Sequence, residues 1–199
     1  MHHTPCACAF WKKEEKRKRF FFWEKSERTG RRMKAFLILE DGNVFTGTSI
    51  GSTREVISEI VFNTSMTGYL EVLTDPSYAG QAVVMTYPLI GNYGITPDME
   101  SGRPWPDGYI VRELSRMPSN FRCEDTIQNF LEKNDIPGIC GIDTRALTKI
   151  LRESGTMNGM ITTNENYDMD EVMKKLKAYF TGDEVSKVTC REKSVLSGA

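Results

Sequence analysis

One stretch, residues 59–94, constrains the fold more than any other part of the sequence, because two apolar runs bracket a connection rich in hydroxyl and turn residues. The runs over 60–62 and 82–85 are short and continuous, which is typical of buried strands. The connection contains Thr64, Ser65, Thr67, Thr74 and Ser77, together with the chain-bending residues Gly68, Pro76 and Gly80. The residues alone leave two interpretations open: a set of self-satisfied turns, or a surface that meets a polar partner.

The first third of the domain is predicted to be rich in strands. Apolar runs over 35–39 and 44–48 flank Asp41 and Gly42. An Asp-Gly pair is the strongest short signal of a hairpin, whose type I′ turn needs a positive φ at both central residues. Residues 55–62 supply the next strand, so we expect the strand pairing in this part of the chain to be local.

The final third has the spacing of helices that alternate with short strands. We predict strands over 109–111, 138–142 and 160–162, and helices that end near 134, run over 144–153 and begin behind a capping box at 168–171. Asp143 is the expected N-cap of the middle helix, and Gly155 is its expected C-terminal cap residue. The fold class is therefore α/β, with a β-rich first part followed by alternating helices and strands.

The helix over 144–153 is predicted to have one basic face. At about 100° per residue, Arg145, Lys149 and Arg152 lie within about 60° of one another. The opposite, apolar face is formed by Ala146, Leu147, Ile150 and Leu151. A basic stripe of this kind is either an ordinary solvated face or a docking surface for a protein partner, and both interpretations stay open.

Residues 1–32 differ in charge from the rest of the 199-residue chain. They carry ten Lys and Arg residues and four Glu, a net charge of +6, whereas the remainder carries sixteen Lys and Arg against twenty-three Asp and Glu, a net charge of −7. A basic arm is compatible with nucleic-acid binding or targeting. However, it lacks the long apolar region of a secretory signal and is too acidic for a transit peptide. We interpret the arm as a non-native or misassigned start, expect it to be disordered, and do not expect nucleic-acid binding.

Compartment and membrane association follow from composition. No apolar run approaches the ~20 residues that span a bilayer, so we expect no membrane segment. The five cysteines are an odd number without a Cys-x-x-Cys pair, which indicates neither a disulfide framework nor a zinc site. Free thiols suit a reducing compartment, and we expect the protein in the cytoplasm.

Cys140 is the residue closest to a motif for nucleophilic catalysis. The run Gly138-Ile-Cys140-Gly141 is similar to the Gly-x-Cys-x-Gly elbow of glutaminases, but here a glycine follows the cysteine directly. His2 and His3 are the only histidines, and both lie in the arm, so no ordered imidazole is expected to activate the thiol. We predict that Cys140 is a small buried side chain, and that this chain contains neither catalytic residues nor a metal site.

Three blocks of sequence, in order, resemble one known family. They are residues 39–51 (LEDGNVFTGTSIG), residues 59–94, and residues 141–161 (GIDTRALTKILRESGTMNGMI). Together they resemble the amino-terminal domain of the small, glutamine-hydrolysing subunit of carbamoyl-phosphate synthetase, from residue 33 to about residue 193. The resemblance implies a fold of the swivelling β/β/α type, with which the predicted elements are compatible.

The resemblance also implies that this chain is a partner-binding half rather than a catalyst. In the family, a class I glutaminase domain hydrolyses glutamine with Cys, His and Glu residues. The large subunit then uses ATP with Mg, and bicarbonate, to make carbamoyl phosphate for pyrimidine and arginine biosynthesis. The implied partners are the large subunit, the glutaminase domain and L-glutamine, with no cofactor in this chain. The alternative is a free-standing binding module whose basic arm contacts nucleic acid or an acidic partner.

The resemblance assigns one site residue. In the family, the serine of a Thr-Asp-Pro-Ser-Tyr segment contacts bound glutamine from across the domain boundary, and here that serine is Ser77. The residues alone favour a simpler role, in which Ser77 caps a turn that Pro76 helps to form. With the resemblance, we predict that Ser77 contributes to the edge of the glutamine site.

These inferences divide the chain into three parts. We predict a basic extension over 1–32, the small-subunit amino-terminal domain over 33–187, and a linker over 188–199 toward a missing glutaminase domain. Trp105 lies in a proline-rich loop and is either an exposed hydrophobe or an anchor against a neighbour. The sequence leaves this choice open.

Overall fold

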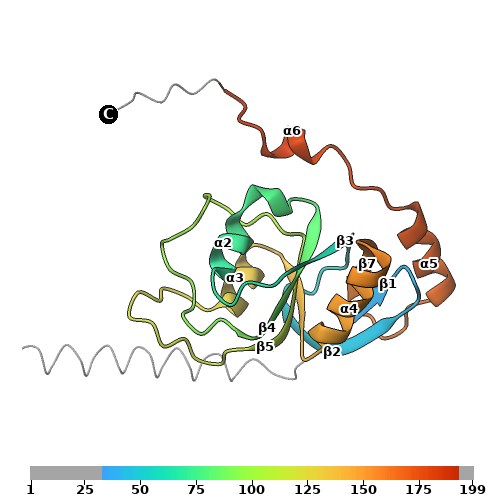
Figure 1. Ribbon diagram of the computed structural model, residues 1–199, viewed down its shortest axis with the longest axis horizontal. Coiled ribbons are helices and arrows are strands. Elements are labelled where there is room, and N and C mark those ends of the chain that lie inside the picture. Colours follow the sequence, from blue (N-terminus) through green and yellow to red (C-terminus); the bar gives the residue numbers. More distant parts are fainter. Residues whose placement is uncertain (1–32, 193–199) are drawn as a thin grey trace, which may run out of the picture. The chain divides into compact units, whose positions relative to one another are not determined.

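The computed structural model describes residues 33–192, so the basic arm and the end of the predicted linker lie outside the described residues. Seven strands form one sheet that closes into a barrel in the order β1-β2-β6-β5-β4-β3-β7 (Figure 1). The strands are β1 (Lys34–Leu39), β2 (Val44–Gly51), β3 (Val56–Asn63), β4 (Gln81–Ile90), β5 (Gly108–Leu114), β6 (Pro137–Cys140) and β7 (Met157–Thr162). The helices are α2 (Tyr69–Thr74), the short 3-10 helix η1 (Pro76–Tyr78), α3 (Ile127–Lys133), α4 (Thr144–Ser154), α5 (Met169–Ala178) and α6 (Glu184–Val188). The predicted α/β class is confirmed.

Strand pairing is less local than predicted. β1 and β2 form the expected hairpin, but the second neighbour of β2 is β6, and β3 pairs with β4 and β7. The prediction of local pairing is therefore wrong for β2 and β3. The physical reason is closure: an unpaired strand edge leaves N–H and C=O groups without partners, and strands from later in the chain satisfy both edges.

β3, β4, β5 and β6 run parallel to one another, whereas the other pairings of the sheet are antiparallel. Parallel neighbours need a crossover connection. Here α2 and η1 connect β3 to β4, a long loop connects β4 to β5, and α3 lies between β5 and β6. The carboxyl ends of these four strands consequently meet at the same edge of the sheet.

The turn between β1 and β2 forms the predicted hairpin, but its turn type differs from the predicted one. Gly42 N donates to Leu39 O at 3.0 Å, and Leu39 N donates to Asn43 O at 2.9 Å. Gly42 has a φ of 88°, but Asp41 does not have a positive φ. The turn is thus a three-residue loop with a glycine bulge rather than a type I′ turn. The hairpin is confirmed, and only the expected turn type is wrong.

Side chains of the strands pack against helices on both sides of the sheet. Val84 of β4 joins the buried cluster that contains Leu147 and Leu151 of α4. Its neighbours Val83 and Met85 point the other way and join the cluster that lies under α2 and α3, which are side by side in Figure 1. Burying a Leu or Val side chain stabilises a fold by roughly 1.5–3 kcal/mol. These helices are therefore stabilised by packing against the core, because helices this short are only marginally stable in isolation.

Both predicted ends of α4 are confirmed. Oδ1 of Asp143 accepts hydrogen bonds from Arg145 N and Ala146 N, each at 3.1 Å, and Gly155 follows the helix with a φ of 88°. The predicted apolar face is narrower than expected, because Ala146 is exposed and Ile150 is only half-buried.

The hydroxyl-rich connection after β3 is more regular than predicted. Tyr69, Leu70 and Leu73 of α2 are buried, and Oγ1 of the buried Thr74 donates to Leu70 O at 2.9 Å. A helix of six residues is shorter than the window over which helical periodicity is visible in a sequence. The connection therefore combines self-satisfied structure with the exposed segments described below.

Candidate functional site

Ser77 lies in η1 and its side chain is exposed. Oδ1 of Asp75 accepts a hydrogen bond from Ser77 N at 2.8 Å, and Tyr78 N donates to Asp75 O at 3.2 Å. Pro76 occupies the first helical position, where its fixed φ suits the start of a helix. The cap of the turn is therefore Asp75, and the interpretation of Ser77 as the cap is wrong. Within residues 33–192 the hydroxyl of Ser77 makes no hydrogen bond.

The turn that carries Ser77 is anchored to the end of β3. Nδ2 of Asn63 donates to the hydroxyl of Tyr78 at 2.9 Å, and Oδ1 of Asn63 accepts from Ser65 N at 2.7 Å. One amide thus fixes both the segment that follows β3 and the segment that precedes β4. Ser77 is presented at a defined place in spite of its exposure.

A charged hollow of about 360 Å³ lies beside this turn. α6 forms part of its wall, and it approaches so closely that a Cβ on Gly80 would lie 2.9 Å from the carboxyl carbon of Glu184. Burial raises the pKa of Asp107, while the positive charge of Arg54 acts in the opposite direction. Glu184 forms an ion pair with Lys187 at 2.7 Å. Three basic residues (Arg54, Arg103 and Lys187) and two acidic ones (Asp107 and Glu184) line the hollow, so charges of both signs lie side by side in it.

Trp105 is an anchor within the described chain. Its backbone N donates to Leu73 O at 3.1 Å, and its Nε1 donates to Oγ of Ser101 at 2.7 Å. The guanidinium carbon of Arg103 lies 3.7 Å from the centre of the indole ring, a cation–π geometry. The ring thereby holds the loop between β4 and β5 against the end of α2.

The basic face of α4 is present as predicted. Arg145, Lys149 and Arg152 are all exposed. Lys149 is 3.8 Å from the carboxylate of Glu153, but an exposed pair of this kind contributes little to stability. The face therefore remains positively charged.

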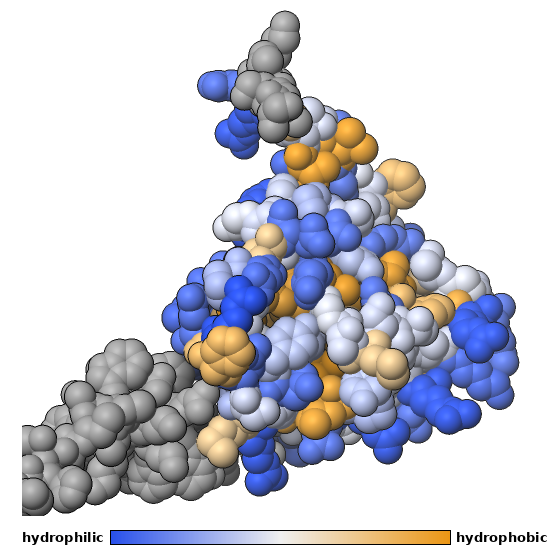
Figure 2. Space-filling view, turned by 60° about the vertical axis from the view of Figure 1, so that its left-hand side comes forward, coloured by the Kyte–Doolittle hydropathy of each residue, from blue (hydrophilic) through white to orange (hydrophobic). Residues whose placement is uncertain are grey.

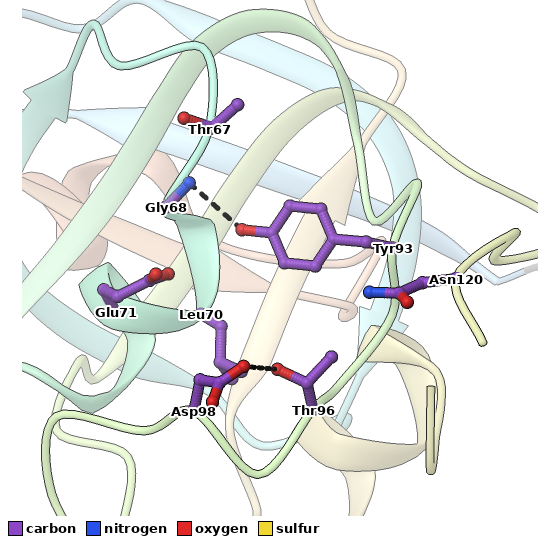
Figure 3. A pocket seen from close by; sticks show the side chains of 8 residues that line it. All are labelled: Thr67, Gly68, Leu70, Glu71, Tyr93, Thr96, Asp98 and Asn120. Carbon is purple, nitrogen blue, oxygen red and sulfur yellow. Dashed lines mark hydrogen bonds between the residues drawn. The ribbon is translucent and has the colours of Figure 1, made fainter. Parts of the chain in front are cut away.

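A second hollow of about 360 Å³ opens beside the start of α2, and we call it the acidic hollow (Figure 3). It is lined by Thr67, Gly68, Leu70, Glu71, Tyr93, Thr96, Asp98 and Asn120. The ring of Tyr93 reaches across it, and its hydroxyl accepts a hydrogen bond from Gly68 N at 3.0 Å. Asp98 pairs with Arg122 at 2.8 Å. Burial raises the pKa of Tyr93, and the carboxylate of Glu71 raises it further.

Two buried tyrosines support the wall of the acidic hollow. Tyr69 stacks on Tyr93 with ring centres 4.0 Å apart. Its hydroxyl donates to Gly94 O at 2.9 Å and accepts from Tyr93 N at 3.2 Å, and burial raises its pKa well above the ordinary value. The hydroxyl of Tyr109 is buried and has no hydrogen-bond partner in the described part of the chain. The sequence analysis did not identify this cluster, because residues 69, 93 and 109 are joined only by the crossover topology.

Cys140 is half-buried at the end of β6 and packs against a buried core cluster, so the side chain predicted to be buried is only partly enclosed. Over residues 33–192 no cluster of three or more His, Cys, Asp or Glu side chains is arranged to hold a metal ion. None of the helices in this same span has the length and hydrophobicity required to cross a membrane.

Comparison with known proteins shows which family this chain is similar to. Residues 37–161 match the model of the carbamoyl-phosphate synthase small chain, CPSase domain. The carbamoyl phosphate synthase small chain of Clostridium perfringens strain 13 is 55% identical over 167 residues, which cover 83% of this chain and 48% of the relative. That of Syntrophotalea carbinolica is 52% identical over 166 residues, covering 80% and 43%. The carbamoyl phosphate synthase pyrimidine-specific small chain of Halalkalibacterium halodurans is 50% identical over 162 residues, covering 80% and 44%. The chain thus spans less than half the length of these relatives.

Proposed function

This chain belongs to the carbamoyl-phosphate synthase small-chain family, and on that premise we propose that it is the amino-terminal structural and interface domain of the small subunit of the glutamine-dependent enzyme. In this role it binds the large subunit and contributes to the edge of the glutamine site. The observation that carries the proposal is the match of most of the chain, at 50–55% identity, to relatives that are themselves named small chains.

We propose that glutamine is hydrolysed by a separate glutaminase domain rather than by these 199 residues. The only histidines of the sequence are His2 and His3, so residues 33–192 contain no histidine. An activated thiol needs such a base beside it. The chain alone is therefore proposed to be inactive, and ATP with Mg belongs to the large subunit, where carbamoyl phosphate is made for pyrimidine and arginine biosynthesis in the cytoplasm.

Ser77 is proposed to contact glutamine. Its hydroxyl is exposed, is not used by the turn that carries it, and lies on a segment that Asp75 and Tyr78 hold in place. A hydroxyl both donates and accepts, so it suits the polar groups of an amino-acid ligand. The glutaminase domain would supply the rest of the pocket.

Capture by the large subunit tests the proposed function. We expect the purified chain to form a complex with the cognate large chain in size-exclusion chromatography, and we expect a version that begins at Met33 to bind equally well. The competing role, a binding module that uses its basic arm, makes the opposite prediction. The chain would then ignore the large subunit and retain nucleic acid in a salt-sensitive complex that is lost with residues 1–32.

The basic face of α4 is proposed to steer the encounter with the large subunit. Reversing its charge with Arg145→Glu, Lys149→Glu and Arg152→Glu should slow association on the order of threefold at low salt, because long-range attraction accelerates encounter. The difference should shrink at high salt, where exposed charges are screened. Stopped-flow association measures this effect.

A matched control for the basic face is available on α5. The exposed residues Lys174, Lys175 and Lys177 can be reversed in the same way, with the same change in net charge. Equal association rates for the two triple variants would show that the basic face of α4 is an ordinary solvated surface.

A further inference from the structure

Exposed apolar side chains gather at one edge of the sheet. Six of the ten large hydrophobic residues that are exposed among residues 33–192 lie in β4 or in the loops that follow the parallel strands β3, β4 and β5. They are Met66, Tyr87, Leu89, Met99, Met117 and Phe121. Figure 2, which brings the left-hand side of Figure 1 forward, shows hydrophobic groups among hydrophilic ones on this face. Single exposed hydrophobes are common, but a group at one edge indicates an interaction site.

Three of these residues are direct chain neighbours of residues that line the acidic hollow. Met66 precedes Thr67, Met99 follows Asp98, and Phe121 follows Asn120, and in each pair the second residue lines the hollow. Met66 is 69% exposed and Phe121 is 89% exposed. We call Met66, Met99 and Phe121 the apolar ring. Methionine and phenylalanine are among the residues enriched in protein interfaces.

The lining of the acidic hollow contains two carboxylates, Glu71 and Asp98. Asp98 is paired with Arg122, whereas Glu71 forms no ion pair within residues 33–192. The hollow therefore keeps one carboxylate without a compensating cation. A lysine or arginine side chain from a partner would supply that charge, while apolar neighbours of the cation would cover the ring.

We infer that the acidic hollow and its apolar ring bind the large subunit, which inserts there a lysine or arginine side chain flanked by apolar side chains. The inference rests on the proposed function, since the partner is the large chain. A small polar ligand would use the carboxylate but not the exposed side chains of Met66 and Phe121, so a protein surface accounts for more of the site. Aromatic and cationic side chains packed at the centre of an interface commonly dominate its affinity.

Two substitutions test the two halves of this surface. Phe121→Asp removes an apolar contact, and Glu71→Lys reverses a charge in the hollow. Each should weaken the complex with the cognate large chain at least fivefold in isothermal titration calorimetry. The effect of Glu71→Lys should diminish in 1 M NaCl, where the Debye length is about 3 Å, while that of Phe121→Asp should persist.

The controls match residue type and exposure. Phe180 is also 89% exposed but lies after α5, and Glu132 is an exposed glutamate of α3. Phe180→Asp and Glu132→Lys should change the dissociation constant less than twofold. Circular dichroism should report the same melting temperature for all four variants, because each replaced side chain is exposed.

The outcomes separate this inference from the proposed function. If the unsubstituted chain binds the large subunit and the Phe121 and Glu71 variants bind equally well, the docking surface lies elsewhere and only this inference is overturned. If the unsubstituted chain does not bind the large subunit at all, the proposed function itself is overturned. Weakening confined to Phe121→Asp and Glu71→Lys supports both.

Discussion

Replacing Ser77 with alanine in a full-length small subunit should lower kcat/KM for glutamine about tenfold and leave ammonia-dependent synthesis of carbamoyl phosphate unchanged. A neutral hydrogen bond contributes about 0.5–1.5 kcal/mol and one to a charged group about 1.5–3 kcal/mol. A tenfold change corresponds to about 1.4 kcal/mol, which lies near the upper end of the first range. Ammonia bypasses the glutamine site, so its use should not depend on this hydroxyl.

Steady-state assays with each nitrogen donor measure the effect. Ser154, the exposed last residue of α4, offers a control, because Ser154→Ala removes a hydroxyl away from η1. It should leave both activities unchanged. Equal loss of the glutamine and ammonia reactions in Ser77→Ala would indicate a general defect and reject the assignment. The turn itself should survive the substitution, because the carboxylate of Asp75 caps it through the backbone of residue 77.

Replacing Gly47 with valine should destabilise the domain by about 3 kcal/mol, the upper end of the usual cost of overpacking a core. A Cβ at this position would lie 2.8 Å from Cγ1 of Ile139 and 2.9 Å from Cγ2 of Ile142, and closer still to the carbonyl oxygen of Cys140. Backbone cannot move aside as a flexible side chain can. Valine would therefore force β2 away from β6 and disrupt the pairing that helps to close the sheet.

Thermal or urea unfolding checks this expectation. For a domain of this size, 3 kcal/mol corresponds to a fall in melting temperature of roughly 6–12 °C. Gly102→Ala is the control, since a Cβ there would have no atom within 4 Å and its φ is not positive. It should stay within about 0.5 kcal/mol of the parent chain. A stable Gly47→Val variant would mean that β2 and β6 separate at little cost.

Local features of the fold could be predicted because their causes lie within a few residues. Asp41 and Gly42 indicated the first hairpin, and Asp143 and Gly155 indicated both ends of α4. In each case a side chain or a glycine acts on the backbone of its immediate neighbours. The hairpin turn type was missed because the bulge at Gly42 satisfies the same register with one positive φ instead of two.

Features that depend on the closed sheet could not be predicted from single residues. β6 is the partner of β2 because the sheet closes. The alternation of apolar and polar residues along a strand shows which face is buried, but it does not specify which strand lies beside it. The same holds for the acidic hollow, which assembles Thr67, Tyr93 and Asn120 from three separate loops. Ser77 was found through the resemblance, and the structure adds that Asp75 rather than Ser77 caps the turn.

The position of β7 has a consequence for synthesis in the cell. β7 pairs with both β1 and β3, so the ring of strands stays open until residue 162 has left the ribosome. Until then the nascent chain offers two free edges on which another polypeptide could form sheet, a known route to aggregation. Translation that stops before residue 157 should therefore yield insoluble protein, even though six of the seven strands have already been made.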